Sequence, residues 1–168
     1  MNSIPLSPIL SRMVEDIREL KLDQPLVIGI HTGGAWIATH LHQALELNSP
    51  LGTLDISFYR DDFSRVGLNP KVRSSSLPEA VEDRQILLVD DVLHTGRTIR
   101  AAMNEIFSFG RPALVKLAVA LDRPGRELPI AADVIGKSVD LEELQQAKIC
   151  QTSGGDIEFQ IITQPAAV

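Results

Sequence analysis

The segment around Asp90 and Asp91 constrains the fold of this chain more than any other part of it. Residues 86–89 are four consecutive apolar residues, and the two aspartates follow them directly. A short apolar run bounded by a turn predicts a strand that is buried on both faces of a parallel sheet. Residues 92–98 then predict a loop that leads into a helix. The chain must therefore bring two carboxylates and a short loop to one end of a buried strand.

The loop over residues 92–98 has the chemistry of a phosphate site. Backbone N–H groups at the start of a helix attract anions, and the hydroxyls of Thr95 and Thr98 can donate further hydrogen bonds. Asp90 and Asp91 would repel a phosphate, but carboxylates accept hydrogen bonds from sugar hydroxyls or hold a divalent metal. The first hypothesis is therefore a sugar phosphate bound across the end of the strand.

Strand and helix patterns alternate along the chain as far as residue 121. Helical periodicity predicts helices over residues 8–22, 35–47 and 97–109, and apolar runs predict strands over residues 26–30, 51–59, 85–89 and 114–121. This alternation predicts an α/β fold with a parallel sheet, in which ligands bind beyond the carboxyl ends of the strands. Later segments predict a short strand at 134–135, a helical turn over 141–145, and a hairpin with strands at 148–151 and 157–162. The polar stretch over residues 60–77 lacks periodicity, which is typical of a functional lid.

Composition excludes several classes of protein. A length of 168 residues suits a single domain over residues 1–168 with a sizeable core. No apolar run approaches the about 18 residues of a membrane span, and the first ten residues carry no basic side chain of a secretory signal. The single cysteine, Cys150, excludes an internal disulfide and agrees with a cytoplasmic location. A net charge of −6 argues against non-specific nucleic-acid binding.

Three segments together carry a family resemblance. Asp90-Asp91 with Thr95-Gly96-Arg97-Thr98 resembles the phosphoribosyl pyrophosphate (PRPP) signature of type I phosphoribosyltransferases. Residues 54–62 and 121–137 are similar to the pyrimidine operon attenuator/uracil phosphoribosyltransferase family, which is a narrower match. The resemblance extends from about residue 8 to residue 162.

The resemblance implies both a fold and two activities. The fold is a type I phosphoribosyltransferase-like parallel sheet flanked by helices, with a flexible lid loop near residues 60–77 and a small hood near residues 122–137. The enzymatic activity converts uracil and PRPP to UMP and pyrophosphate, with Mg²⁺ as the cofactor. The regulatory activity is attenuation of transcription through a pyrimidine operon leader RNA when UMP and UTP are abundant. Family members are homodimers or homotetramers.

The resemblance also assigns the PRPP site. Asp90, Asp91 and Arg60 are the expected catalytic residues, and the two aspartates are also the expected metal ligands. The family often carries an arginine where this chain has Gly33, so that a cation for pyrophosphate is missing there. Arg60 is the first candidate to replace it, and Arg73 is a weaker one. The expected PRPP-binding residues, besides Asp90 and Asp91, are Thr32, Gly33, Gly34, Leu93, His94, Thr95, Gly96, Arg97 and Thr98.

The hood is expected to hold uracil and, on its outside, RNA. The expected uracil contacts are Asp122, Arg123, Ile135 and Gly136. The expected RNA contacts that keep a cation are Arg126 and Lys137. Glu15 and Ala131 stand at RNA-contact positions without one, and each missing cation removes about one phosphate contact.

Other interpretations of the same residues stay open. The apolar run with two acids also occurs in receiver domains, although there it follows the first strand, and adjacent aspartates also serve as charges at a helix start. Two further functional alternatives are a PRPP- or nucleotide-sensing regulator with little catalysis, and a phosphoribosyltransferase for another base. Trp36 is expected to be a core residue rather than a ligand contact.

Overall fold

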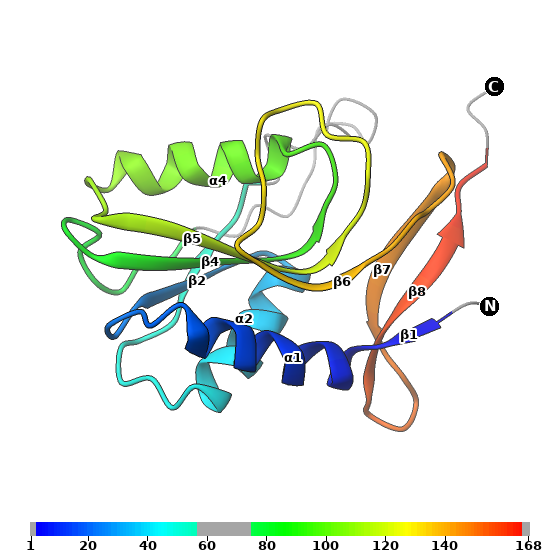
Figure 1. Ribbon diagram of the computed structural model, residues 1–168, viewed down its shortest axis with the longest axis horizontal. Coiled ribbons are helices and arrows are strands. Elements are labelled where there is room, and N and C mark those ends of the chain that lie inside the picture. Colours follow the sequence, from blue (N-terminus) through cyan, green and yellow to red (C-terminus); the bar gives the residue numbers. More distant parts are fainter. Residues whose placement is uncertain (1–2, 57–74, 166–168) are drawn as a thin grey trace.

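A five-stranded parallel sheet forms the centre of the molecule (Figure 1). The computed structural model describes residues 3–56 and 75–165. Every neighbouring pair of strands in this sheet is parallel, which confirms the predicted α/β fold. The strand order is β3 (Gly52–Leu54), β2 (Leu26–Ile30), β4 (Gln85–Leu93), β5 (Leu114–Asp122) and β6 (Val134–Ser138).

Helices cover both faces of this sheet. Helices α1 (Leu6–Glu19) and α2 (Gly33–Ala44) lie on one face, and α4 (Arg97–Ser108) lies on the other (Figure 1). Alternate residues of β4 belong to the two apolar cores: Leu87 packs with α1 and α2, whereas Leu88 packs with α4. Both faces of the strand are therefore buried, which explains its continuous run of apolar residues.

A smaller antiparallel sheet packs beside the α1 face. It has the order β1 (Ser3–Pro5), β8 (Ile157–Thr163) and β7 (Gln145–Gln151), and its β7–β8 hairpin was predicted whereas β1 was not. Phe159 of β8 is fully buried in the core beneath α1, so this sheet is anchored to the main body. In Figure 1 the small sheet lies at the end of the molecule where β6 leads into β7.

Several predicted boundaries were wrong in ways that affect the site. Strand β4 continues to Leu93, so that Asp90 and Asp91 belong to the strand instead of following it. Helix α2 begins at Gly33, two residues before the predicted start. Residues 141–145 contain a turn, in which the Gln145 N–H donates to the Glu142 carbonyl at 2.9 Å, and lead directly into β7 instead of forming a turn of helix.

The strand order reverses direction at the centre of the sheet. The chain adds β3 on one side of β2, and it adds β4, β5 and β6 on the other side. In open α/β sheets the crevice at such a reversal, beyond the carboxyl ends of the strands, is the usual place for a ligand. The segments that follow β2 and β4 therefore lie beside one another.

Within the described ranges, none of the helices has the length and apolar character that a membrane crossing requires.

Candidate active site

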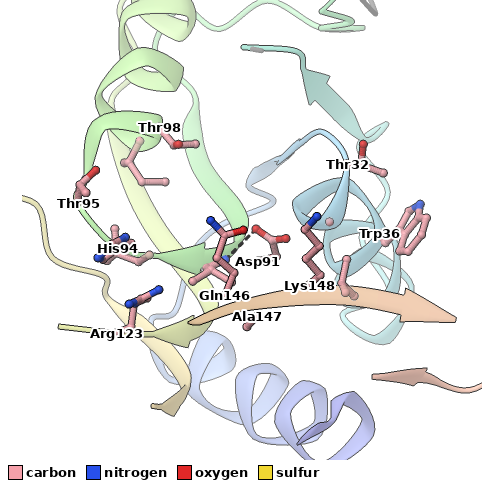
Figure 2. A pocket seen from close by; sticks show the side chains of 16 residues that line it. Thr32, Trp36, Asp91, His94, Thr95, Thr98, Arg123, Gln146, Ala147 and Lys148 are labelled. Carbon is pink, nitrogen blue, oxygen red and sulfur yellow. Dashed lines mark hydrogen bonds between the residues drawn. The ribbon is translucent and has the colours of Figure 1, made fainter. Parts of the chain in front are cut away.

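A pocket of about 510 Å³ opens at the carboxyl ends of β2 and β4 (Figure 2). Four parts of the chain line it: the start of α2, the end of β4 with the start of α4, one residue that follows β5, and strand β7. Most of the expected PRPP-binding residues therefore meet at one place. The lining residues are Thr32, Gly33, Trp36, Asp91, Val92, Leu93, His94, Thr95, Gly96, Thr98, Ile99, Arg123, Gln146, Ala147, Lys148 and Ile149.

The two adjacent aspartates have different surroundings. Burial, more than strand alternation, separates them, because the pocket opens at the end of β4 and its last three residues, 91–93, all line it. Asp91 lines the pocket, whereas Asp90 is only 2% exposed and is not among the lining residues. Asp90 Oδ1 accepts the Asp91 N–H at 2.9 Å, and Asp91 Oδ1 accepts the Val92 N–H at 2.8 Å. Asp91 is therefore the carboxylate that a ligand meets, and Asp90 supports it from the interior.

The two glycines after β2 allow α2 to start directly against β4. A Cβ atom on Gly33 would lie 2.2 Å from Asp91 Oδ2, and one on Gly34 would lie 2.6 Å from the Val89 carbonyl oxygen. The carboxylate of Asp91 thus occupies the space that a side chain at position 33 would need. The preceding peptide bond, His31–Thr32, is cis.

The loop before α4 has the geometry of an anion site. Gly96, the N-cap residue, has a φ of 93°, a left-handed conformation that favours glycine. The first N–H groups of α4 have no acceptor within the helix, and those after Arg97 are available to a ligand. Thr95 Oγ1 accepts the Arg97 N–H at 3.2 Å, and Thr98 lines the pocket.

Residues 122–130 hold this loop from behind. The N–H groups of Glu127 and Leu128 both donate to the Thr95 carbonyl, at 2.9 and 3.1 Å. The guanidinium of Arg126 donates to the carbonyls of His94 at 2.6 Å, Arg123 at 3.0 Å and Ile130 at 2.9 Å, and it pairs with the Asp122 carboxylate. Arg97 Nε pairs with Glu127 Oε2 at 2.6 Å. The shape of the loop is therefore fixed before any ligand binds.

One of the four expected uracil contacts lines the pocket. Arg123 does so, is 8% exposed, and donates from Nη1 to the Gln145 carbonyl at 2.9 Å. Asp122 lies instead on a second hollow, with residues 123–126 and 138–140; Arg123 lines both hollows. Ile135 and Gly136 are not among the lining residues, because residues 134–138 form a strand of the central sheet. A Cβ on Gly136 would lie 2.4 Å from Ile9 Cγ2, so this glycine packs against α1.

Strand β7 contributes pocket residues that the sequence analysis missed. Gln146 and Lys148 are exposed and rise from β7 toward Asp91 in Figure 2. Only the pairing of distant strands brings them to Thr32, so no local motif marks them; the polar–apolar alternation over residues 146–149 is the available signal. Trp36, expected in the core, is 40% exposed and lines the same pocket.

The remaining expected residues lie elsewhere. Arg60, Arg73 and most of the expected lid at 60–77 lie outside the described residues. Lys137, an expected RNA contact, is exposed on β6. Arg126, the other expected RNA contact, is engaged by the intramolecular hydrogen bonds described above.

Comparison with known proteins identifies the family. Residues 8–148 match the phosphoribosyl transferase domain family. The chain belongs to the phosphoribosyl transferase family. A protein of Nitrosococcus oceani named "Bifunctional protein PyrR" is 52% identical over 152 residues, covering 89% of this chain and 82% of that protein. A protein of the same name from Pseudomonas paraeruginosa is 51% identical over 159 residues, covering 92% and 94%.

Solved structures of other phosphoribosyl transferases share the fold. A hypoxanthine-guanine phosphoribosyltransferase of Bacillus anthracis has a TM-score of 0.66 at 15% identity, covering 83% of this chain and 84% of that one. The hypoxanthine phosphoribosyltransferase of Trypanosoma cruzi has a TM-score of 0.64 at 22% identity, covering 92% and 93%. At these identities the likeness supports the fold and does not identify the base that this chain uses.

Proposed function

We propose that this phosphoribosyl transferase joins uracil to PRPP, releasing pyrophosphate and UMP, and that it also regulates pyrimidine operon transcription by binding leader RNA. The observation that carries the enzymatic part is the convergence, in one pocket, of the α4 N-terminus, the Asp91 carboxylate and the start of α2. A sugar with a phosphate at one end and a pyrophosphate at the other matches this arrangement. The name "Bifunctional protein PyrR" of relatives at about half identity supports a protein with two roles.

The proposed chemistry divides PRPP among three parts of the pocket. The 5′-phosphate binds the loop over residues 94–98, where helix N–H groups and the hydroxyls of Thr95 and Thr98 donate to its oxygens. The pyrophosphate binds beside Thr32 and the backbone at the start of α2, on the side that the Asp91 carboxylate leaves open.

Asp91 acts at the ribose, between these two sites. The carbon–oxygen bond from ribose C1 to pyrophosphate breaks, a bond from uracil N1 to C1 forms, and the N1 proton leaves. The ribose gains positive charge while the first bond lengthens, and the Asp91 carboxylate stabilises that charge and accepts a hydrogen bond from a ribose hydroxyl. Asp90 acts indirectly, by accepting the Asp91 N–H and so fixing the position of its neighbour.

The residues present fit Mg²⁺ that binds together with the substrate. Among the described residues no group of three or more His, Cys, Asp or Glu side chains could form a metal cage. Mg²⁺ commonly uses one or two protein carboxylates plus substrate phosphates, and Asp91 offers one such carboxylate in the pocket. When bound, Mg²⁺ neutralises negative charge on the departing pyrophosphate.

We assign the uracil ring to the part of the pocket near Arg123. This residue is the one expected uracil contact that lines the pocket, and its guanidinium ties the segment after β5 to the turn before β7. Asp122 supports the neighbouring loop through Arg126 instead.

The test is a steady-state assay with PRPP and a panel of bases, run with and without Mg²⁺. We expect turnover with uracil and Mg²⁺, and none with orotate, hypoxanthine or guanine. Turnover with another base in place of uracil would support a phosphoribosyltransferase of different specificity. Absence of product at every enzyme concentration would reject the enzymatic role and support a PRPP-sensing regulator.

We assign RNA binding first to Lys137, because its side chain is exposed. Arg126 would have to leave its carbonyl partners to reach RNA. A titration with leader RNA should give binding that weakens as salt rises, because phosphate contacts dominate nucleic-acid affinity. Lys137→Gln should lower the affinity several-fold, whereas salt-independent binding would contradict this assignment.

We place the protein in the cytoplasm as a homodimer or homotetramer, and light scattering measures its assembly.

A further inference from the structure

The pyrophosphate part of the proposed site needs a cation that its own loop does not supply. Position 33 is a glycine and carries no side chain, and the Asp91 carboxylate fills the adjacent space. A pyrophosphate group beside Thr32 and Gly33 would therefore meet backbone N–H groups and a nearby negative charge. A positive side chain from another part of the fold would offset that repulsion.

Three arginines near the pocket already have other partners. Arg123 Nη1 donates to the Gln145 carbonyl, and Arg123 Nη2 lies near the carbonyls of Leu141 and Glu142. Arg97 pairs with Glu127, and Arg126 pairs with Asp122. Each of these guanidinium groups is held by protein partners, and Arg123 Nε is a buried donor that has none among the described residues.

Lys148 differs from these arginines. It lines the pocket, its residue is exposed, and within residues 3–56 and 75–165 no carboxylate forms an ion pair with it. On β7 its neighbours Ala147 and Ile149 border the pocket and also pack against the core beneath α1, whereas the strand alternation turns the exposed Gln146 and Lys148 the other way. Figure 2 shows the Lys148 side chain rising from β7 beside Asp91, on the side of the pocket where Thr32 and Trp36 lie.

The backbone of Lys148 is well anchored. It pairs with Gln160 of β8, and β8 is anchored by the fully buried Phe159. The Cα position is therefore set by a sheet, while the flexible four-carbon stem lets the ammonium group adjust to a phosphate.

We propose that Lys148 binds the pyrophosphate group of PRPP, and so supplies from β7 the positive charge that Gly33 lacks. This inference rests on the proposed function, because it takes PRPP as the ligand. It makes the small antiparallel sheet part of the substrate site. It also gives this site, in which position 33 is a glycine, a charge-assisted contact to phosphate.

The experiment measures binding to wild-type protein and to Lys148→Gln by calorimetry with Mg²⁺ present. Three probes are used: PRPP, inorganic pyrophosphate and ribose 5-phosphate. We expect Lys148→Gln to weaken PRPP and pyrophosphate by about tenfold or more, the usual effect of losing one charged hydrogen bond. Ribose 5-phosphate should bind unchanged, because its phosphate lies at residues 94–98.

Two variants act as controls. Lys148→Arg should keep most of the affinity for pyrophosphate, since it keeps the charge. Lys21→Gln, which removes an exposed lysine outside the pocket lining, should change none of the three affinities. Unaltered PRPP and pyrophosphate binding in Lys148→Gln, or an equal loss for ribose 5-phosphate, would overturn the proposal.

The same measurements separate this proposal from the proposed function. Binding does not require turnover, so Lys148 is tested even if wild-type protein gives no product with uracil. Wild-type protein that turns over uracil while Lys148→Gln binds PRPP normally would reject the role of Lys148 and leave the enzymatic function standing.

Discussion

Residues 94–98 form one wall of the pocket, and residues 146–149 of β7 form another. The first wall presents mainly backbone groups to a ligand. Gly96 has a left-handed conformation, the first N–H groups of α4 face the pocket, and the loop carbonyls accept hydrogen bonds from Arg126 and from the N–H groups of Glu127 and Leu128. The β7 wall presents the side chains of Gln146 and Lys148. Backbone contacts suit a group that every substrate of the site shares, such as a phosphate. Contacts made by side chains can be altered by a single substitution.

The two walls also differ in how the chain assembles them. The loop over residues 94–98 follows β4, and the segment over residues 122–130 that holds it follows β5, the next strand of the same sheet. The β7 wall arrives from a separate sheet, whose strands include residues from both ends of the described chain. Changes in the first wall should therefore affect stability and binding together, and changes in the second should affect binding alone.

The largest expected effect lies between the walls, at Asp91. Asp91→Asn should lower kcat by about a hundredfold or more, because the proposed mechanism relies on its charge to stabilise the ribose in the transition state. The melting temperature should change little, because Asp91 is part-exposed at the pocket. Steady-state kinetics and thermal unfolding measure the two quantities.

Asp90→Asn is the matched variant for Asp91→Asn. It alters a buried carboxylate that accepts the Asp91 N–H, so it should reduce stability while costing less activity than Asp91→Asn. Equal loss of activity in both single variants would show that the aspartates share one role, and the division between them described here would fail.

Arg126→Lys tests the backbone wall. A lysine cannot reproduce the fork that donates to the carbonyls of His94, Arg123 and Ile130, so unfolding should become easier by about 2 kcal/mol. The KM for PRPP should rise several-fold because the loop is no longer held. The exposed Arg100 on α4 provides the control, since Arg100→Lys should change neither value. Normal stability and KM in Arg126→Lys would contradict a positioning role.

The smallest functional effect is expected at Gly136, which lies in neither wall. A methyl group there would meet Ile9 Cγ2 at 2.4 Å and the Ala120 carbonyl oxygen at 2.7 Å, so Gly136→Ala should cost about 1–2 kcal/mol of stability. The KM values for uracil and PRPP should stay unchanged. An increase confined to the KM for uracil would restore Gly136 to the base site, as the family resemblance had implied.

The sequence predicted the parts of this molecule that local patterns encode. The buried run at residues 86–89, the helix that begins at Arg97 and the β7–β8 hairpin follow from periodicity and turn residues, and the structure confirms these elements. The predicted uracil contacts Ile135 and Gly136 stay a prediction: the structure places them in β6, outside the lining of this pocket, and the packing of that strand against α1 depends on the tertiary fold. Lys148 could not be placed at the pocket from sequence, because Thr32, Trp36 and Asp91, beside which it lies, are 116, 112 and 57 positions away along the chain.

The short strand β1 gives the pocket a remote point of control. Ser3, Ile4 and Pro5 pair with β8, and β8 in turn pairs with β7, so three strands in series connect the residues just before α1 to Lys148. If Lys148 binds the substrate as proposed, a change near residue 3 that disturbs β1 is expected to shift Lys148 through the backbone hydrogen bonds of these strands, without any contact with the pocket. The residues that follow β8 lie one strand nearer to Lys148, so an affinity tag at either end should be removed before phosphate affinity is measured.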